Sequence, residues 1–194
     1  MHRKADEGGI PGRIWTEENA ARRRLGGAGP DESPGVTTRD LHPSSQAVNA
    51  ILVAAGLPGR VRMLSEPAPT AQAAARQIGC PVGAIANSLV FATADDEPVL
   101  IMTSGRHRVD LDRVRDGYGL HLHRASADFV RAHTGQPIGG VAPVGHPRPI
   151  PTLVDRALAD YEQLWAAGGI PHAVFPVSYP DLLMLTNGTE AEVA

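Results

Sequence analysis

The stretch Gly83–Ser104, GAIANSLVFATADDEPVLIMTS, holds two apolar runs separated by a short polar segment. This pattern predicts a β-hairpin with strands at Ser88–Thr93 and Val99–Thr103, joined by the turn ADDEP. Both strands are apolar on both faces, which is typical of strands in the middle of a buried sheet. The hairpin therefore predicts where the core of the fold lies.

Two polar side chains, Asn87 and Ser88, stand at the entrance to the first strand. A buried amide without a hydrogen-bond partner costs about 1–3 kcal/mol. Asn87 therefore either ties the strand end to a loop or belongs to a polar site. Ser88 points the other way if the segment is extended.

The composition indicates one globular domain. The chain has 194 residues and 42% hydrophobic content, enough for one buried core. Its apolar runs, such as residues 50–57, are much shorter than the roughly 20 residues of a membrane span. Cys80 is the single cysteine, which excludes an internal disulfide or a multi-thiolate metal site. We expect a cytoplasmic protein with no metal, no other cofactor and no membrane partner.

Charge and glycine content divide the chain. Residues 1–44 hold seven basic and seven acidic groups among many Gly, Pro and Ser, so we expect a flexible tail there. The folded domain is expected at 45–188, with a short C-terminal tail at 189–194. Residues 45–187 hold 11 Arg against 12 Asp plus Glu, which argues against a DNA partner and leaves only local nucleic-acid contact.

The domain alternates short helices and strands. Helices are predicted at 46–55, 71–78, 111–115, 127–132, 156–166 and 179–185, and further strands at 60–64, 120–124, 152–155 and 173–177. Residues 134–151 contain four Gly and five Pro and are predicted to form an irregular loop of fixed shape. This order favours an α+β fold with a mixed sheet over a doubly wound parallel fold.

Five segments together resemble the YbaK/EbsC family, the editing domain associated with prolyl-tRNA synthetases. They read TAQAAARQIGCPVGAIANSLVF, VLIMTSGRHRVDLDRV, TGQPIGGVAPVGHP, VDRALADYEQLWAAGG and PHAVFPVSYPDLLMLTNG, within residues 69–188. The resemblance implies a curved, mixed, largely antiparallel and barrel-like β-sheet surrounded by helices. It also implies a pocket for the aminoacylated end of a tRNA and hydrolysis of the ester that joins amino acid to ribose, without a metal.

The resemblance also implies a glycine-rich loop at the pocket. Gly139, Gly140, Val141 and Pro143 match this loop, and Gly140 is the position expected to take part in catalysis. Ester hydrolysis needs donors for the developing oxyanion, which backbone N–H groups can supply. A rigid surface turn is the alternative.

Asn87 departs from the best-known members of the family, which carry a catalytic lysine there. The only lysine of this chain is Lys4, in the predicted tail, so no ammonium of the domain can compensate. An amide donates hydrogen bonds without bringing a charge, and we therefore predict Asn87 as a weaker catalytic donor.

Further substrate-binding residues follow from the same motifs. Ser104 and Gly105 resemble the edge of the family's pocket, and Ser88 adjoins Asn87. His146 and His172 lie in Gly/Pro loops, where a neutral imidazole could position water or bind adenosine. Six arginines could contact acceptor-stem phosphates or simply solvate the surface: Arg106, Arg108, Arg113, Arg115, Arg124 and Arg131.

Three functions stay open at this point. The first is a hydrolase that deacylates mischarged aminoacyl-tRNA in trans. The second is a module that binds aminoacyl-tRNA or a synthetase without turnover, and the third is an aminoacyl-tRNA-dependent transferase of specialised metabolism. All three share the tRNA acceptor end as a partner, and an aminoacyl-tRNA synthetase is a further partner suggested by the resemblance.

Overall fold

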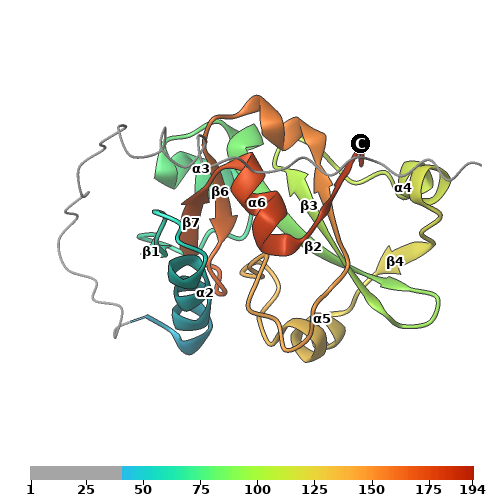
Figure 1. The fold of residues 1–194 in the computed structure, drawn as a ribbon, viewed down its shortest axis with the longest axis horizontal. Coiled ribbons are helices and arrows are strands. Elements are labelled where there is room, and N and C mark those ends of the chain that lie inside the picture. Colours follow the sequence, from blue (N-terminus) through green and yellow to red (C-terminus); the bar gives the residue numbers. More distant parts are fainter. Residues whose placement is uncertain (1–40) are drawn as a thin grey trace, which may run out of the picture. The chain divides into compact units, whose positions relative to one another are not determined.

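The computed structural model describes residues 41–194 (Figure 1). Most of the predicted tail, residues 1–40, lies outside the described residues. Within residues 41–194, no helix combines the length and the hydrophobicity that a membrane crossing requires.

Short helices connect the strands of the domain, and their ends follow capping signals. The helices are α2 (Pro43–Ala54), α3 (Ala71–Ile78), α4 (Leu111–Tyr118), α5 (Ala127–Thr134) and α6 (Tyr179–Thr186), with 3-10 turns η2 (Val82–Ala84) and η3 (Arg156–Asp160). Helix α3 has its predicted bounds, because the Thr70 hydroxyl caps its first turn and Gly79 ends it in the left-handed conformation. Helix α2 begins earlier than the predicted residue 46, and the side chain of His42 caps it by accepting from the Ser44 N–H.

The strands of the described part form one mixed sheet. They are β1 (Arg62–Met63), β2 (Ile85–Thr93), β3 (Pro98–Ser104), β4 (Leu122–Arg124), β5 (Thr152–Asp155), β6 (Leu164–Ala167), β7 (Ala173–Val177) and β8 (Thr189–Ala191). Their order is β1-β7-β6-β2-β3-β5-β8, and β4 also pairs with β2. The α+β class and the mixed, mostly antiparallel sheet are confirmed. The curved sheet is open, since its end strands β1 and β8 do not pair with each other.

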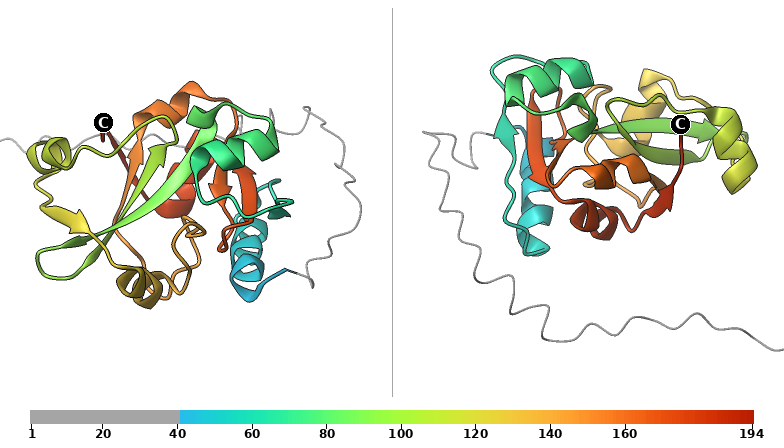
Figure 2. Two further views of the ribbon diagram at one scale, coloured as in Figure 1. Left: turned by 180° about the vertical axis from the view of Figure 1, so that it is seen from behind. Right: turned by 90° about the horizontal axis from the view of Figure 1, so that it is seen from above.

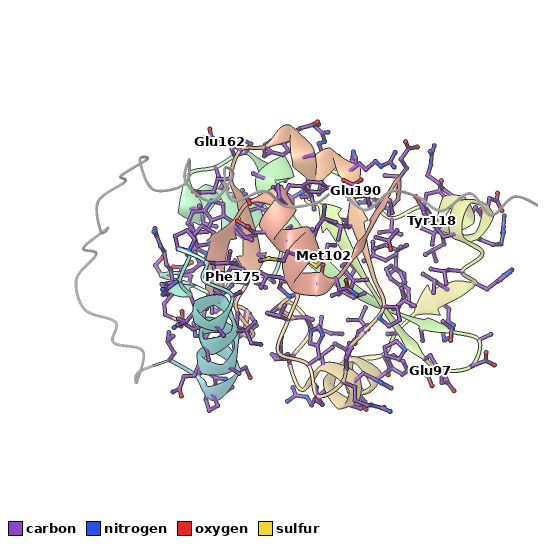
Figure 3. All side chains as sticks on the ribbon, in the orientation of Figure 1. Glu97, Met102, Tyr118, Glu162, Phe175 and Glu190 are labelled. Carbon is purple, nitrogen blue, oxygen red and sulfur yellow. The ribbon has the colours of Figure 1, made fainter. Side chains whose placement is uncertain are left out.

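Helices cover the sheet on both faces. Helices α2 and α6 lie on one face and α3 lies on the other, as the two opposite views show (Figure 1, Figure 2). The largest apolar cluster lies beneath α2 and α6 and includes the fully buried Met102 and Phe175, whereas the exposed Glu97 and Glu162 point outward (Figure 3). The predicted hairpin β2–β3 thus crosses the middle of the core.

One predicted helix is wrong. Residues 156–166 form the 3-10 turn η3 followed by strand β6, which pairs with both β2 and β7. Leu164 is completely buried, and a short apolar run of this kind can be a strand or a buried helix. Position within the sheet overrides the helical pattern.

The C-terminal boundary also differs from the expectation. Residues 189–191, assigned to a tail, form β8 and pair in parallel with β5. Val193 beyond them is fully buried with Val114 and Ile101. The folded unit therefore extends past residue 188.

Candidate active site

One edge of strand β2 is paired at both ends but not in its middle. We call this unpaired stretch of the edge the ladder gap. Strand β3 pairs with β2 from Ala86 to Ala92, so it occupies one edge completely. On the other edge β6 pairs only at Ile85 and Ala86, and β4 pairs only from Phe91 onward. The ladder gap is this second edge over residues 87–90, which no strand of the described part pairs.

The main chain of Ser88 points toward the ladder gap. The Gly105 N–H donates to the Ile85 carbonyl over 2.8 Å, so these opposed residues form a hydrogen-bonded pair. Bonded and non-bonded pairs alternate along antiparallel strands. Asn87 therefore bonds to Thr103 through its main chain, and the N–H and C=O of Ser88 face the open edge.

The side chains of Asn87 and Ser88 lie on opposite faces of the sheet. The Ser88 hydroxyl lies 3.3 Å from the sulfur of Met102, on the face of the main core. Asn87 lies on the other face, opposite Thr103 in β3 and between Ile85 and Leu89 in sequence. Both residues are half-buried.

Asn87 does not tie its strand to a loop. Among residues 41–194, no hydrogen bond joins its side-chain amide to another protein group. The amide is thus a donor and acceptor at the border of the ladder gap that the described part of the fold leaves available for water or a ligand.

The glycine-rich loop is held from inside by Gln136, which the sequence analysis missed. This buried side chain accepts from the Ala142 N–H over 2.6 Å and donates to the Val144 carbonyl over 3.2 Å. The ring of His146 donates to the Ala142 carbonyl over 2.9 Å. The sequence offered one signal for this role, because Gln136 is the one amide side chain in the Gly/Pro segment 134–151.

Gly140 is needed for close packing. A Cβ built there would overlap the backbone of Ile170 and would lie 2.6 Å from the Pro171 nitrogen. The Gly140 N–H already donates to the Pro137 carbonyl over 3.0 Å. The expected donor role therefore does not fit this N–H group, because its hydrogen bond closes a turn.

Other groups of the loop fit the donor role better. Gly139 has φ 82° and open space where a Cβ would lie. In the part of the chain that the structure describes, the N–H groups of Gly139 and Val141 make no loop hydrogen bond. The side chains of Val141 and Pro143 are buried, so these two residues contribute mainly to packing.

His172 follows two residues that pack against the glycine-rich loop. It directly follows Pro171, against which Gly140 packs. The His172 carbonyl accepts from the Leu64 N–H over 2.7 Å, and its half-buried side chain has no hydrogen-bond partner within residues 41–194. Because the preceding strand β6 runs parallel beside β2, the segment 168–172 starts next to the ladder gap.

Ser104 and Gly105 hold the end of β3. The buried Ser104 hydroxyl donates to the Gly83 carbonyl over 2.8 Å. A Cβ on Gly105 would overlap the Val82 carbonyl and lie 2.7 Å from the Ala71 Cβ. Both residues thus fasten β3 to η2 and α3.

A buried carboxylate, Asp155, organises the face that Asn87 shares. One of its oxygens accepts from Thr103 Oγ1 (3.2 Å), the Ser104 N–H (3.0 Å) and His107 Nδ1 (2.8 Å), and the other accepts from the Ala157 N–H (3.0 Å). Thr103 is the cross-strand neighbour of Asn87. These hydrogen bonds fix the positions of the Asp155 carboxylate and the Thr103 hydroxyl on this face. The sequence analysis did not predict them.

The predicted arginine surface is divided by carboxylates. Ion pairs join Arg106 to Asp160, Arg113 to Glu192, and Arg115 to Asp112 and Asp116. Among residues 41–194, Arg108, Arg124 and Arg131 have no such partner. Half of the six arginines therefore remain available to phosphates.

Comparison with known proteins points to one family. The aminoacyl-tRNA editing domain model matches residues 65–185. A solved structure described as "a putative trans-editing enzyme for prolyl tRNA synthetase" is 38% identical, with a TM-score of 0.74, and the match covers 79% of this chain and 98% of that one.

Two curated bacterial proteins are also similar. "Putative Cys-tRNA(Pro)/Cys-tRNA(Cys) deacylase EbsC" of Enterococcus faecalis (strain ATCC 700802 / V583) is 27% identical over 135 residues, which cover 66% of this chain and 79% of that protein. "Uncharacterized protein YwhH" of Bacillus subtilis (strain 168) is 28% identical over 113 residues, 58% of this chain and 72% of that protein. The chain therefore belongs to the aminoacyl-tRNA editing domain family, the YbaK/EbsC family that its motifs resemble.

Proposed function

We propose that this protein deacylates mischarged aminoacyl-tRNA in trans, as an editing hydrolase of the prolyl-tRNA type. The observation that carries the proposal is the half-buried Asn87 amide, which makes no protein hydrogen bond in the described part and borders the ladder gap. Two relatives, described as "a putative trans-editing enzyme for prolyl tRNA synthetase" and "Putative Cys-tRNA(Pro)/Cys-tRNA(Cys) deacylase EbsC", support the same activity.

The reaction is an ester hydrolysis. Water attacks the carbonyl carbon of the aminoacyl group, and the carbonyl oxygen becomes an oxyanion in the tetrahedral intermediate. The bond to the ribose oxygen then breaks, and that oxygen takes up a proton. The products are a free amino acid and a tRNA with a free terminal hydroxyl.

Groups from β2 and from the glycine-rich loop would stabilise the oxyanion. The Asn87 amide donates to it from β2, and the N–H group of the exposed Gly139 donates from the glycine-rich loop. His172, next to that loop, positions the attacking water or the terminal adenosine. We expect the cytoplasm as the site of action and an aminoacyl-tRNA synthetase as a further partner.

A second candidate is binding without turnover. It is favoured by the amide at residue 87, because an amide stabilises an oxyanion less than the ammonium found at this position in better-known members. The lack of any lysine after Lys4 leaves the described domain without a substitute. The pocket could then retain affinity for charged tRNA while losing rate.

A deacylation assay on a panel of correctly charged and mischarged tRNAs tests the proposal. We expect release of the free amino acid from at least one mischarged tRNA, at a rate above spontaneous hydrolysis. Tight binding with no release would instead show a binding module. Appearance of the aminoacyl group on an added nucleophile other than water would show a transferase.

A further inference from the structure

Within residues 41–194, main-chain groups that face the ladder gap have no strand partner. The alternation set by the Gly105–Ile85 hydrogen bond directs the Ser88 N–H and C=O toward this edge. Pairing with β6 stops at Ala86, and pairing with β4 starts at Phe91. Ser88 as a whole residue is half-buried, so this stretch of the edge is not sealed off from solvent.

Partly buried main-chain groups need hydrogen bonds. An N–H or C=O that loses water without gaining a partner costs about 1–3 kcal/mol. A ligand that presents a donor and an acceptor at this edge therefore replaces the water of both Ser88 groups. The edge is a binding element independent of any side chain.

The size of the ladder gap limits the ligand. Residues 87–90 span three intervals of about 3.4 Å each, or roughly 10 Å. This length is too short for a paired strand of ordinary size, but it accommodates one extended amino-acid unit. The segment 168–172 starts beside the same edge, because β6 runs parallel to β2, and Gly140 packs against that segment.

The edge offers an amine neutral hydrogen-bond acceptors. Residues 83–93, which include the ladder gap, carry no acidic or basic side chain, so a carbonyl is the strongest acceptor that β2 offers to a cation there. An aminoacyl ester carries a protonated α-amino group two bonds away from its carbonyl. In an antiparallel pair, the N–H and C=O of one residue bond to the C=O and N–H of the residue opposite. The amine and the carbonyl of an aminoacyl unit present a donor and an acceptor at the same spacing.

We propose that the main chain of Ser88 binds the aminoacyl unit of the substrate directly. The Ser88 carbonyl accepts a hydrogen bond from the α-ammonium group, and the Ser88 N–H donates to the carbonyl of the same unit. The inference rests on the proposed function for its substrate class. It predicts that the protein discriminates against acylated α-amines irrespective of the amino-acid side chain.

The test uses binding, so that it does not depend on turnover. The probes are non-hydrolysable 3′-aminoacylamido-adenosines with a free or an N-acetylated α-amine, titrated calorimetrically against the full chain. We expect the free amine to bind at least about tenfold more tightly, the range of a hydrogen bond to a charged group. Equal affinity for the two probes, or no binding of the free amine, would overturn the inference.

Two variants separate main chain from side chain. Ser88→Pro removes the N–H, and proline is tolerated where a strand N–H faces an open edge; Ser88→Ala removes only the hydroxyl. We expect Ser88→Pro to bind the free amine about five- to tenfold more weakly than Ser88→Ala, with a similar melting temperature. Equal affinities of the two folded variants would show that the N–H does not face a ligand. If Ser88→Pro does not fold, the comparison of the free and N-acetylated probes decides the inference.

The inference and the proposed function can fail separately. Discrimination between the two probes without any release of amino acid from charged tRNA would support the Ser88 site and reject the hydrolase. Release of amino acid at equal rates from free and N-acetylated aminoacyl-tRNA would support the hydrolase and reject the Ser88 site.

Discussion

At the scale of the residue, Asn87 is the side chain on which the proposed function depends most. Its amide has no hydrogen-bond partner within residues 41–194. We expect Asn87→Ala to lower the deacylation rate about ten- to a hundredfold, as for the loss of one or two oriented donors, with little change in stability. Asn87→Lys should keep or raise the rate. Single-turnover rates and melting temperatures of both variants provide the measurement.

The alternative is that Asn87 stabilises the fold and takes no part in the reaction. If the Asn87→Ala protein loses about 1–3 kcal/mol of unfolding free energy while its rate per folded molecule is unchanged, then Asn87 is a structural residue. Ser104→Ala is a suitable comparison for stability, because the Ser104 hydroxyl is buried and bonded to the Gly83 carbonyl.

His146 makes stability dependent on pH. Burial holds the pKa of its imidazole below the ordinary value of 6.5, and the bond to the Ala142 carbonyl opposes this only partly. The unfolded chain therefore takes up the proton first as the pH falls. The stabilisation is complete above about pH 6.5 and is lost as the pH falls through that value toward the lower folded pKa.

The prediction is tested with His146→Gln, which keeps an N–H donor but does not titrate. We expect the unfolding free energy of the original protein to fall more steeply between pH 7 and pH 5 than that of the variant. Urea titrations at several pH values give the unfolding free energy of each protein. If this free energy falls equally with pH in the original protein and in His146→Gln, the assignment is contradicted.

At the scale of the element, Gln136 fixes the shape of the glycine-rich loop. Gln136→Leu leaves the Ala142 N–H and the Val144 carbonyl without the partners they have in the fold. We expect a loss of about 2 kcal/mol or more in unfolding free energy, from about 1–3 kcal/mol for each buried group left unpaired. Gln136→Glu keeps an acceptor for the Ala142 N–H but sets a buried carboxylate oxygen against the Val144 carbonyl, and it should lose at least as much. Equal stability of the original protein and Gln136→Leu in denaturant titrations would refute this role.

Local signals predicted some elements well and others poorly. Helix α3 has a hydroxyl cap and a terminal glycine, so its bounds could be predicted from its own residues. Strand β6 has no such local marker, since Leu164–Ala167 becomes a strand only by fitting between β2 and β7. Strand β8 likewise depends on β5, which lies over 30 residues earlier in the sequence.

The candidate site shows the same division. The motifs identified Asn87 and the glycine-rich loop as candidates from their positions in the sequence alone. The ladder gap could not be predicted, because it arises from where β6 stops and β4 starts along β2. For the same reason the partners of Asp155, which come from β3 and the loop after it, became visible only in the folded chain.

At the scale of the whole molecule, the proposed function requires a surface for tRNA, and we expect it at the arginines that have no ion pair within residues 41–194. Arg124 stands opposite Phe91, at the end of the ladder gap. Arg131 lies in the last turn of α5. By contrast, the Arg115 guanidinium is held by Asp112 and Asp116 over 2.6 and 2.9 Å. A guanidinium already neutralised by two carboxylates has less to gain from a phosphate.

We therefore expect Arg124→Gln and Arg131→Gln each to weaken binding of charged tRNA and to reduce the slope of log K against log salt concentration by about 0.7–0.9, the change for one lost phosphate contact. Arg115→Gln serves as the matched control and should leave the slope unchanged. Binding isotherms at several salt concentrations provide the measurement. The same reduction of the slope in all three variants would mean that the tRNA does not distinguish paired from unpaired arginines, and that its phosphates follow another surface.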